Sequence, residues 1–156
     1  MVFLRRVMSA CRVSGEVKHH IVEISNPMTL KNNVLILSAG RRVELVQSFQ
    51  RVLRRYFPDS SVLTTDLDPA LSAACQVADH YFSSPPANNH EYIVFLIELC
   101  QKENVGIVIP TIVTELFSLS HHRARFVSVG THVIISDESL VVACRDKRLM
   151  PQVFLL

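Results

Sequence analysis

Residues 33–42 read Asn-Val-Leu-Ile-Leu-Ser-Ala-Gly-Arg-Arg, an apolar run that breaks at a small turn and continues into two arginines. A continuous run of Val, Ile and Leu is typical of a parallel strand that is buried on both faces. Ser38, Ala39 and Gly40 allow a tight turn into a helix whose first amides face outward and favour anions. These residues predict the start of a nucleotide-type βαβ unit.

Arg41 and Arg42 stand at the entrance of the predicted helix, where the helix dipole favours negative charge. Two cations at this place destabilise the helix unless they face an acidic or phosphorylated partner. We therefore interpret both arginines as residues that face a partner or an anionic ligand. The alternative is that they are solvated surface residues beside an ordinary strand–helix turn.

The rest of the chain repeats the alternation of strand and helix patterns. Apolar residues recur at three- and four-residue steps from Val43 to about Tyr56, which predicts a helix. The alternation implies an α/β fold: a Rossmann-like, doubly wound parallel sheet of about five strands, in the order 3-2-1-4-5, with helices on both faces. After the first strand and helix, we expect strands at 61–66, 78–82, 105–109 and 131–135. Helices are expected at 69–75, 90–103 and 112–126, and Ser136 is expected to cap one more helix.

A sheet of this kind binds ligands outside the carboxyl ends of its strands, at the switch point between the first and fourth strands. The loops that follow the first, second and fourth strands would meet there. Glu115 has a second interpretation, because an acid near the start of a helix is favourable by itself. We predict no catalytic residue, and a substrate- or anion-binding set of Ser38, Ala39, Gly40, Arg41, Arg42, Asp66, Thr111 and Glu115.

Other nucleotide motifs are weak or absent. The turn has a single glycine, whereas the dinucleotide fingerprint needs three at defined separations. Asp66 ends the second strand, where an acid could hold a ribose hydroxyl, or it could cap the next turn instead. Gly40 is not followed by the Lys-Ser or Lys-Thr of a Walker loop, and no serine stands in a nucleophile elbow.

Composition and charge exclude several classes of protein. A chain of 156 residues with 49% hydrophobic residues can fill a core on both faces of one sheet. The formal net charge is +2, but five basic and two acidic residues fall in the first 33 positions, so the remainder is nearly neutral. It lacks the basic stripe that a nucleic acid needs, and no apolar run approaches the ~20 residues of a membrane span.

The cysteines and histidines indicate neither disulfides nor a metal. The cysteines stand singly in apolar surroundings, as reduced core residues of a cytoplasmic protein do. Neighbouring histidines point apart on a helix or a strand, so a shared metal ion is not expected. The residues concerned are Cys11, Cys75, Cys100 and Cys144, and the pairs His19-His20 and His121-His122.

Three segments in order carry a family resemblance: residues 35–42, Ile109-Pro110-Thr111 with Thr114-Glu115-Leu116, and Asp146-Lys147. Together they resemble the amino-terminal, pre-ATP-grasp domain of an ATP-grasp ligase. The resemblance runs from about Val34 to the end of the chain and is closest to the group of the carbamoyl-phosphate synthase large subunit and the pyrrolysine-biosynthesis ligase. Relatives usually carry an acid where this chain has Val113, which leaves any role of that position in doubt.

The resemblance implies an enzyme that activates a carboxylate with ATP as an acyl phosphate, which an amine then attacks. In such ligases ATP and Mg²⁺ belong to two later lobes, so we expect no cofactor in this chain and no ligase activity from it alone. The expected partners are an ATP-grasp lobe from the same or an adjacent gene and a small-molecule carboxylate. The alternative is a stand-alone nucleotide- or metabolite-binding Rossmann-like module.

The expected organisation has three parts. Residues 1–32 are expected to be a poorly ordered or artefactual extension, with Met28 as the true start; a transit peptide is an alternative for this segment. Residues 33–145 form the Rossmann-like domain, and 146–156 are the truncated start of a connection to an ATP-grasp domain. The apolar Val153–Leu156 segment predicts self-association or burial against a partner.

Overall fold

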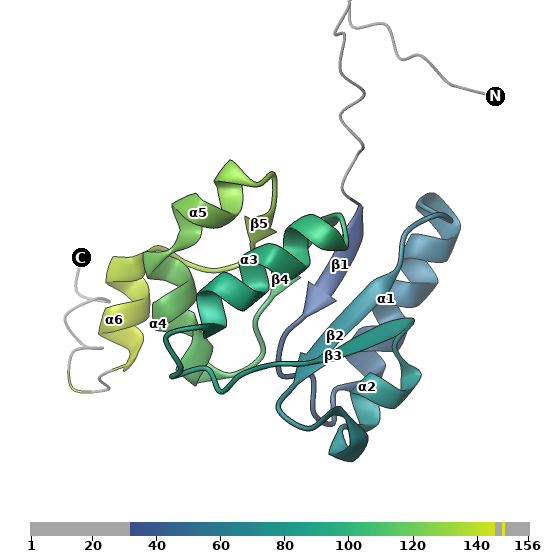
Figure 1. The fold of residues 1–156 in the computed structure, drawn as a ribbon, viewed down its shortest axis with the longest axis horizontal. Coiled ribbons are helices and arrows are strands. Elements are labelled where there is room, and N and C mark those ends of the chain that lie inside the picture. Colours follow the sequence, from purple (N-terminus) through teal and green to yellow (C-terminus); the bar gives the residue numbers. More distant parts are fainter. Residues whose placement is uncertain (1–31, 146–147, 149–156) are drawn as a thin grey trace, which may run out of the picture.

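Five strands form one parallel sheet in the order β3-β2-β1-β4-β5 (Figure 1). The structure is a computed structural model that describes residues 32–145 and Arg148. The register places Val34 beside Val62 on one side and beside Ile107 on the other, so β1 is the central strand. The predicted α/β fold and strand order are confirmed. The strands are β1 (Asn33–Ile36), β2 (Val62–Asp66), β3 (His80–Ser83), β4 (Val105–Ile109) and β5 (His132–Val133).

Helices cover both faces of this sheet (Figure 1). Successive residues of β1 point to opposite faces, as the pleat of a strand requires: Val34 and Ile36 pack with Val46 and Leu53 of α1, whereas Leu35 packs on the opposite side with α3 and α4. The helices are α1 (Val43–Tyr56), η1 (Pro69–Leu71), α2 (Ala73–Val77), α3 (Tyr92–Lys102), α4 (Val113–His121), α5 (Arg123–Ser128) and α6 (Glu138–Arg145).

Two of the predicted helices are divided. The helix expected at 112–126 breaks at His122, whose backbone (φ −100°, ψ 12°) separates α4 from α5. Leu119 and Phe126 are both fully buried and lie about two helical turns apart in the sequence. Because this spacing is also that of one continuous helix, the sequence pattern does not indicate the break. The helix expected at 69–75 breaks at Ser72, whose hydroxyl accepts the amide of Cys75 and caps α2.

Two further expectations are corrected at the end of the domain. The last helix begins at Glu138, and the amide of Val141 donates to the carbonyl of Asp137, so Asp137 rather than Ser136 precedes its first turn. Cys75 and Cys100 are buried as expected, whereas Cys144 is exposed, because it lies on α6 at the surface.

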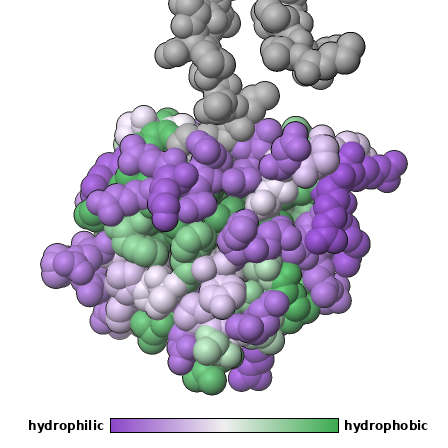
Figure 2. Space-filling model, turned by 45° about the vertical axis from the view of Figure 1, so that its right-hand side comes forward, coloured by the Kyte–Doolittle hydropathy of each residue, from purple (hydrophilic) through white to green (hydrophobic). Residues whose placement is uncertain are grey.

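Several predictions concern residues outside the described part of the chain. These are the proposed extension apart from residue 32, the Asp146-Lys147 pair, the connection at 146–156 and the apolar Val153–Leu156 segment. Within residues 32–145 and 148, no helix has the length and apolar character needed to cross a bilayer. Figure 2 shows one face of the molecule, where hydrophilic side chains predominate and apolar patches lie between them.

Candidate functional site

The turns after β1, β2 and β4 meet at the carboxyl edge of the sheet, where the site was predicted. The amide of Leu37 donates to the carbonyl of Ile109 at the end of β4 (2.9 Å), and the amide of Ala39 donates to the carbonyl of Thr65 in β2 (3.0 Å). The turn after β1 is thus fastened to both neighbouring strands. We call this edge, formed by residues 38–42, Asp66 and residues 111–115, the rim.

Ser38 is the centre of the hydrogen bonds that join the first and fourth strands at the rim. Its backbone is left-handed (φ 45°), which is uncommon for a residue with a side chain. Its hydroxyl donates to Oε1 of Glu115. Its carbonyl accepts a hydrogen bond from the hydroxyl of Thr111 (2.9 Å) and a longer one from Nη1 of Arg42 (3.4 Å).

Arg42 links the two loops across the surface of the rim. Its Nη2 donates to the carbonyl of Thr111 (2.8 Å), while Nη1 reaches the carbonyl of Ser38. Both acceptors are neutral, so neither contact is an ion pair. Arg41 is also exposed, and within the described residues neither arginine forms an ion pair. The two arginines give the entrance of α1 a local positive charge.

Asp66 holds the same turn from the side of β2. Its Oδ2 accepts the amide of Gly40 (2.9 Å), and its Oδ1 accepts the amide of Leu67 (2.8 Å). The bond to Leu67 stays within the loop after β2, whereas the next helical turn, η1, is capped by Asp68, whose side chain accepts the amide of Ala70. Gly40 has φ 53°, a conformation that side chains rarely adopt, and a Cβ there would lie 3.5 Å from Nη1 of Arg42. The amide expected to face an anion is already occupied by this carboxylate.

Glu115 belongs to the rim by its backbone, but its side chain points into the protein and is not exposed on the surface of the rim. Its side chain is fully buried in the first turn of α4. Oε1 accepts hydrogen bonds from the hydroxyls of Ser38 and Tyr92, the latter at 2.7 Å, and Oε2 has no hydrogen-bond partner among the described residues. Burial raises the pKa of the Tyr92 phenol, and the charge and hydrogen bond of Glu115 raise this pKa further. The carboxylate therefore accepts hydrogen bonds from residues of two other segments, and it is not exposed to a ligand at the surface.

The structure brings all eight predicted residues to the rim. Thr111 contributes its hydroxyl, which lies 2.8 Å from the carbonyl of Leu37, and Ala39 is fully buried beneath the turn. Arg41 and Arg42 are the exposed charged side chains of this set. Sequence reasoning missed Tyr92, which falls within the helix predicted at 90–103. Its position among apolar residues of α3 gave no sign that its hydroxyl contacts Glu115.

Backbone amides of the turn after β1 already form hydrogen bonds within the protein. No group of three or more His, Cys, Asp or Glu side chains that could hold a metal ion occurs in the described residues. The amides of Ala39 and Gly40, which would have to cradle a phosphate, already donate to Thr65 and Asp66. A groove of about 280 Å³ lies elsewhere, between α4 and α6, and is mainly apolar, with Phe117 and Leu140 among its lining residues.

Comparison with known proteins supports the same kind of domain. A family model described as PylC-like, N-terminal domain matches residues 34–134. The solved biotin carboxylase domain of a single-chain bacterial carboxylase is similar in fold, with a TM-score of 0.53 and 18% sequence identity. That similarity covers 78% of this chain and 28% of the carboxylase chain. A search of curated proteins finds no significant match.

Proposed function

Because the chain belongs to the family of PylC-like N-terminal domains, we propose that it is the substrate-side domain of an ATP-dependent carboxylate–amine ligase of the ATP-grasp type. We propose that this ligase resembles the large subunit of carbamoyl-phosphate synthase. In the proposal, the rim binds the anionic group of a small substrate, either a carboxylate or the acyl phosphate made from it. The enclosing ATP-grasp lobe is the partner that completes the site.

The exposed charge of Arg41 and Arg42, neither of which forms an ion pair with a described residue, is the observation that carries this proposal. A guanidinium offers donors in a planar fork that matches the oxygens of a carboxylate or a phosphate. Arg42 donates two hydrogen bonds, to the carbonyls of Ser38 and Thr111, which hold its side chain where the loops after β1 and β4 meet. The other donors, and those of Arg41, stay available to an anion.

ATP and Mg²⁺ belong, in this proposal, to lobes outside the 156 residues. The occupied amides of the rim and the lack of a metal-binding cluster in the described residues support this division of labour. The similarity spans 28% of the length of the matched carboxylase chain. We propose that the chain alone does not ligate its substrates.

The stand-alone nucleotide-binding module is the weaker candidate. A dinucleotide would need Asp66 for its ribose and the amides of the turn for its pyrophosphate. Asp66 instead accepts two backbone amides, and one of these belongs to Gly40. The same contact therefore engages both groups that a dinucleotide would use.

The test is a titration of the 156-residue chain with acetate, inorganic phosphate and MgATP at constant ionic strength. The Nε–Hε signals of the arginines, followed by NMR, report the binding. We expect acetate and phosphate to shift the signals of Arg41 and Arg42 with saturation, and MgATP to bind no more tightly than phosphate. The variant with alanine at both positions lacks these signals, so the backbone amides of residues 38–42 report on it, and we expect neither anion to shift them.

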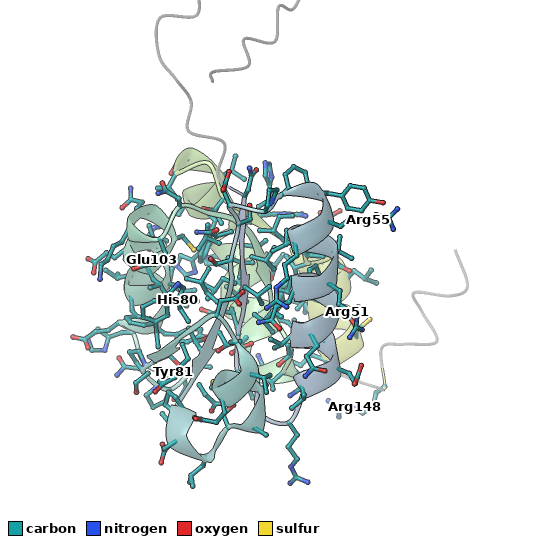
Figure 3. The ribbon with its side chains drawn as sticks, turned by 90° about the vertical axis from the view of Figure 1, so that its right-hand side faces the viewer. Arg51, Arg55, His80, Tyr81, Glu103 and Arg148 are labelled. Carbon is teal, nitrogen blue, oxygen red and sulfur yellow. The ribbon has the colours of Figure 1, made fainter. Side chains whose placement is uncertain are left out.

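The matched control removes two arginines from the outer side of the same helix. Arg51 and Arg55 project from α1 away from the sheet (Figure 3), and Arg51 pairs with Glu44. Their replacement by alanine lowers the net charge equally and leaves anion binding at the rim intact. Loss of binding in the control variant, or tight MgATP binding by the unaltered chain, would contradict the proposal.

A further inference from the structure

The rim is supported by a group of three side chains from three segments, of which two are buried and that of Ser38 is partly buried. Ser38 lies in the turn after β1, Tyr92 at the start of α3 and Glu115 in the first turn of α4, and one oxygen of Glu115 accepts both hydroxyls. Tyr92 is 1% exposed and Glu115 is fully buried, so neither side chain can touch a ligand at the surface. Their contact with the rim runs through Ser38.

We infer that Tyr92 and Glu115 are positioning residues of the anion-binding rim, which hold Ser38 in its left-handed conformation and thereby set the position of Arg42. The inference rests on the proposed function and adds to it the device that shapes the site. It assigns a purpose to two side chains that bind no substrate themselves.

The conformation of Ser38 requires such a support. A residue with a side chain disfavours positive φ, and it keeps this conformation only where the surroundings enforce it. The hydroxyl of Ser38 is fixed on Glu115 from below, while its carbonyl faces Arg42 and Thr111. Rotation of the Ser38 backbone would therefore move the acceptor that Arg42 contacts.

Burial makes the support rigid. Water cannot replace the Tyr92 donor, because the bond from Tyr92 to Glu115 is buried, and the low local dielectric strengthens this hydrogen bond. The second donor also matters, because Tyr92 holds the same carboxylate oxygen by a buried hydrogen bond of 2.7 Å. If the Tyr92 hydroxyl is removed, Oε1 of Glu115 keeps one donor and the side chain gains freedom to turn. The displacement then reaches Arg42 through Ser38.

The experiment uses Tyr92→Phe, which keeps the buried ring and removes the hydroxyl. Its matched control is Tyr81→Phe on the edge strand β3, where the tyrosine is 53% exposed (Figure 3). We expect Tyr92→Phe to weaken phosphate binding at the rim about fivefold, the factor of one hydrogen bond of ordinary net strength. The control binds phosphate like the unaltered chain.

A second pair of variants separates the effect of the Ser38 hydroxyl from the effect of the strained backbone at this residue. Ser38→Gly permits positive φ but removes the hydroxyl, whereas Ser38→Ala removes the hydroxyl and keeps the strain. We expect both to bind phosphate more weakly than the unaltered chain, with Ser38→Ala weaker than Ser38→Gly. Full affinity in Ser38→Gly would overturn the inference, because the hydroxyl anchor would then be dispensable.

The ligand-free protein gives a readout that does not depend on the proposed function. Tyr92→Phe should shift the Nε–Hε signal of Arg42 and the backbone amides of residues 38–42, with the fold intact by circular dichroism. If these signals stay in place while only the free energy of unfolding changes, the role is structural and the inference fails. If they move but the unaltered chain binds no phosphate, the proposed function fails and the positioning stands.

Discussion

Two carboxylates hold the turn after β1, and they do so in different ways. Asp66 is partly exposed and accepts backbone amides, including that of Gly40. Glu115 is fully buried and accepts side-chain hydroxyls of Ser38 and Tyr92. Water can replace a lost partner at the exposed site but not at the buried one. The free energy of unfolding should therefore depend far more on Glu115 than on Asp66.

Removal of the buried carboxylate is expected to have the largest effect. Glu115→Ala leaves the hydroxyls of Ser38 and Tyr92 buried without their acceptor and opens a cavity, which together lower the free energy of unfolding by about 3 kcal/mol. Urea denaturation followed by circular dichroism measures this change. A loss below about 1 kcal/mol, the size expected for a solvated surface acid, would contradict the comparison.

Alkaline pH should act on the same group. The pKa of Tyr92 is raised in the folded protein, so both states hold the phenolic proton below about pH 10, and only the unfolded state releases it above that pH. The contribution of Tyr92 to stability is complete below pH 10 and declines by about 1.4 kcal/mol per pH unit above it. Urea denaturation at a series of pH values should show a shallower decline for Tyr92→Phe. Equal slopes would contradict the raised pKa.

Removal of the partly exposed carboxylate is expected to have a smaller effect. Asp66→Ala frees the amides of Gly40 and Leu67, which then bind water, so the free energy of unfolding should fall by about 1 kcal/mol. Thermal denaturation of this variant beside Glu115→Ala gives the ratio directly. A greater loss at Asp66 than at Glu115 would reverse the comparison.

A third carboxylate, introduced at the surface, is expected to have the smallest effect. Val113 is 68% exposed at the first position of α4, where the helix dipole favours negative charge. Val113→Asp should raise the free energy of unfolding by about 0.5 kcal/mol at low salt, and added salt should remove the gain. Val113→Asn is the uncharged control, and an equal gain in both variants would exclude the dipole as the cause.

The fold was predictable because its signals are local. The apolar run of β1 and the helical spacing that follows it each lie within about 15 consecutive residues, and alternation of such units implies the strand order. The position of the rim followed from that order. The bond between Ser38 and Glu115 joins residues 77 positions apart, and no local pattern encodes it. The hydrogen bond from the Gly40 amide to Asp66 depends on the register of β1 against β2, which the spacing of apolar residues in the sequence does not give.

A titration of Tyr92 as the sole tyrosine tests the buried group most directly. The chain has three tyrosines and no tryptophan, and Tyr56 and Tyr81 are exposed, so Tyr56→Phe with Tyr81→Phe leaves the phenol of Tyr92 alone. We predict that absorbance of the phenolate near 295 nm stays absent at about pH 10 and rises only together with unfolding, seen by circular dichroism. A phenolate signal near pH 10 in the folded protein would contradict the account.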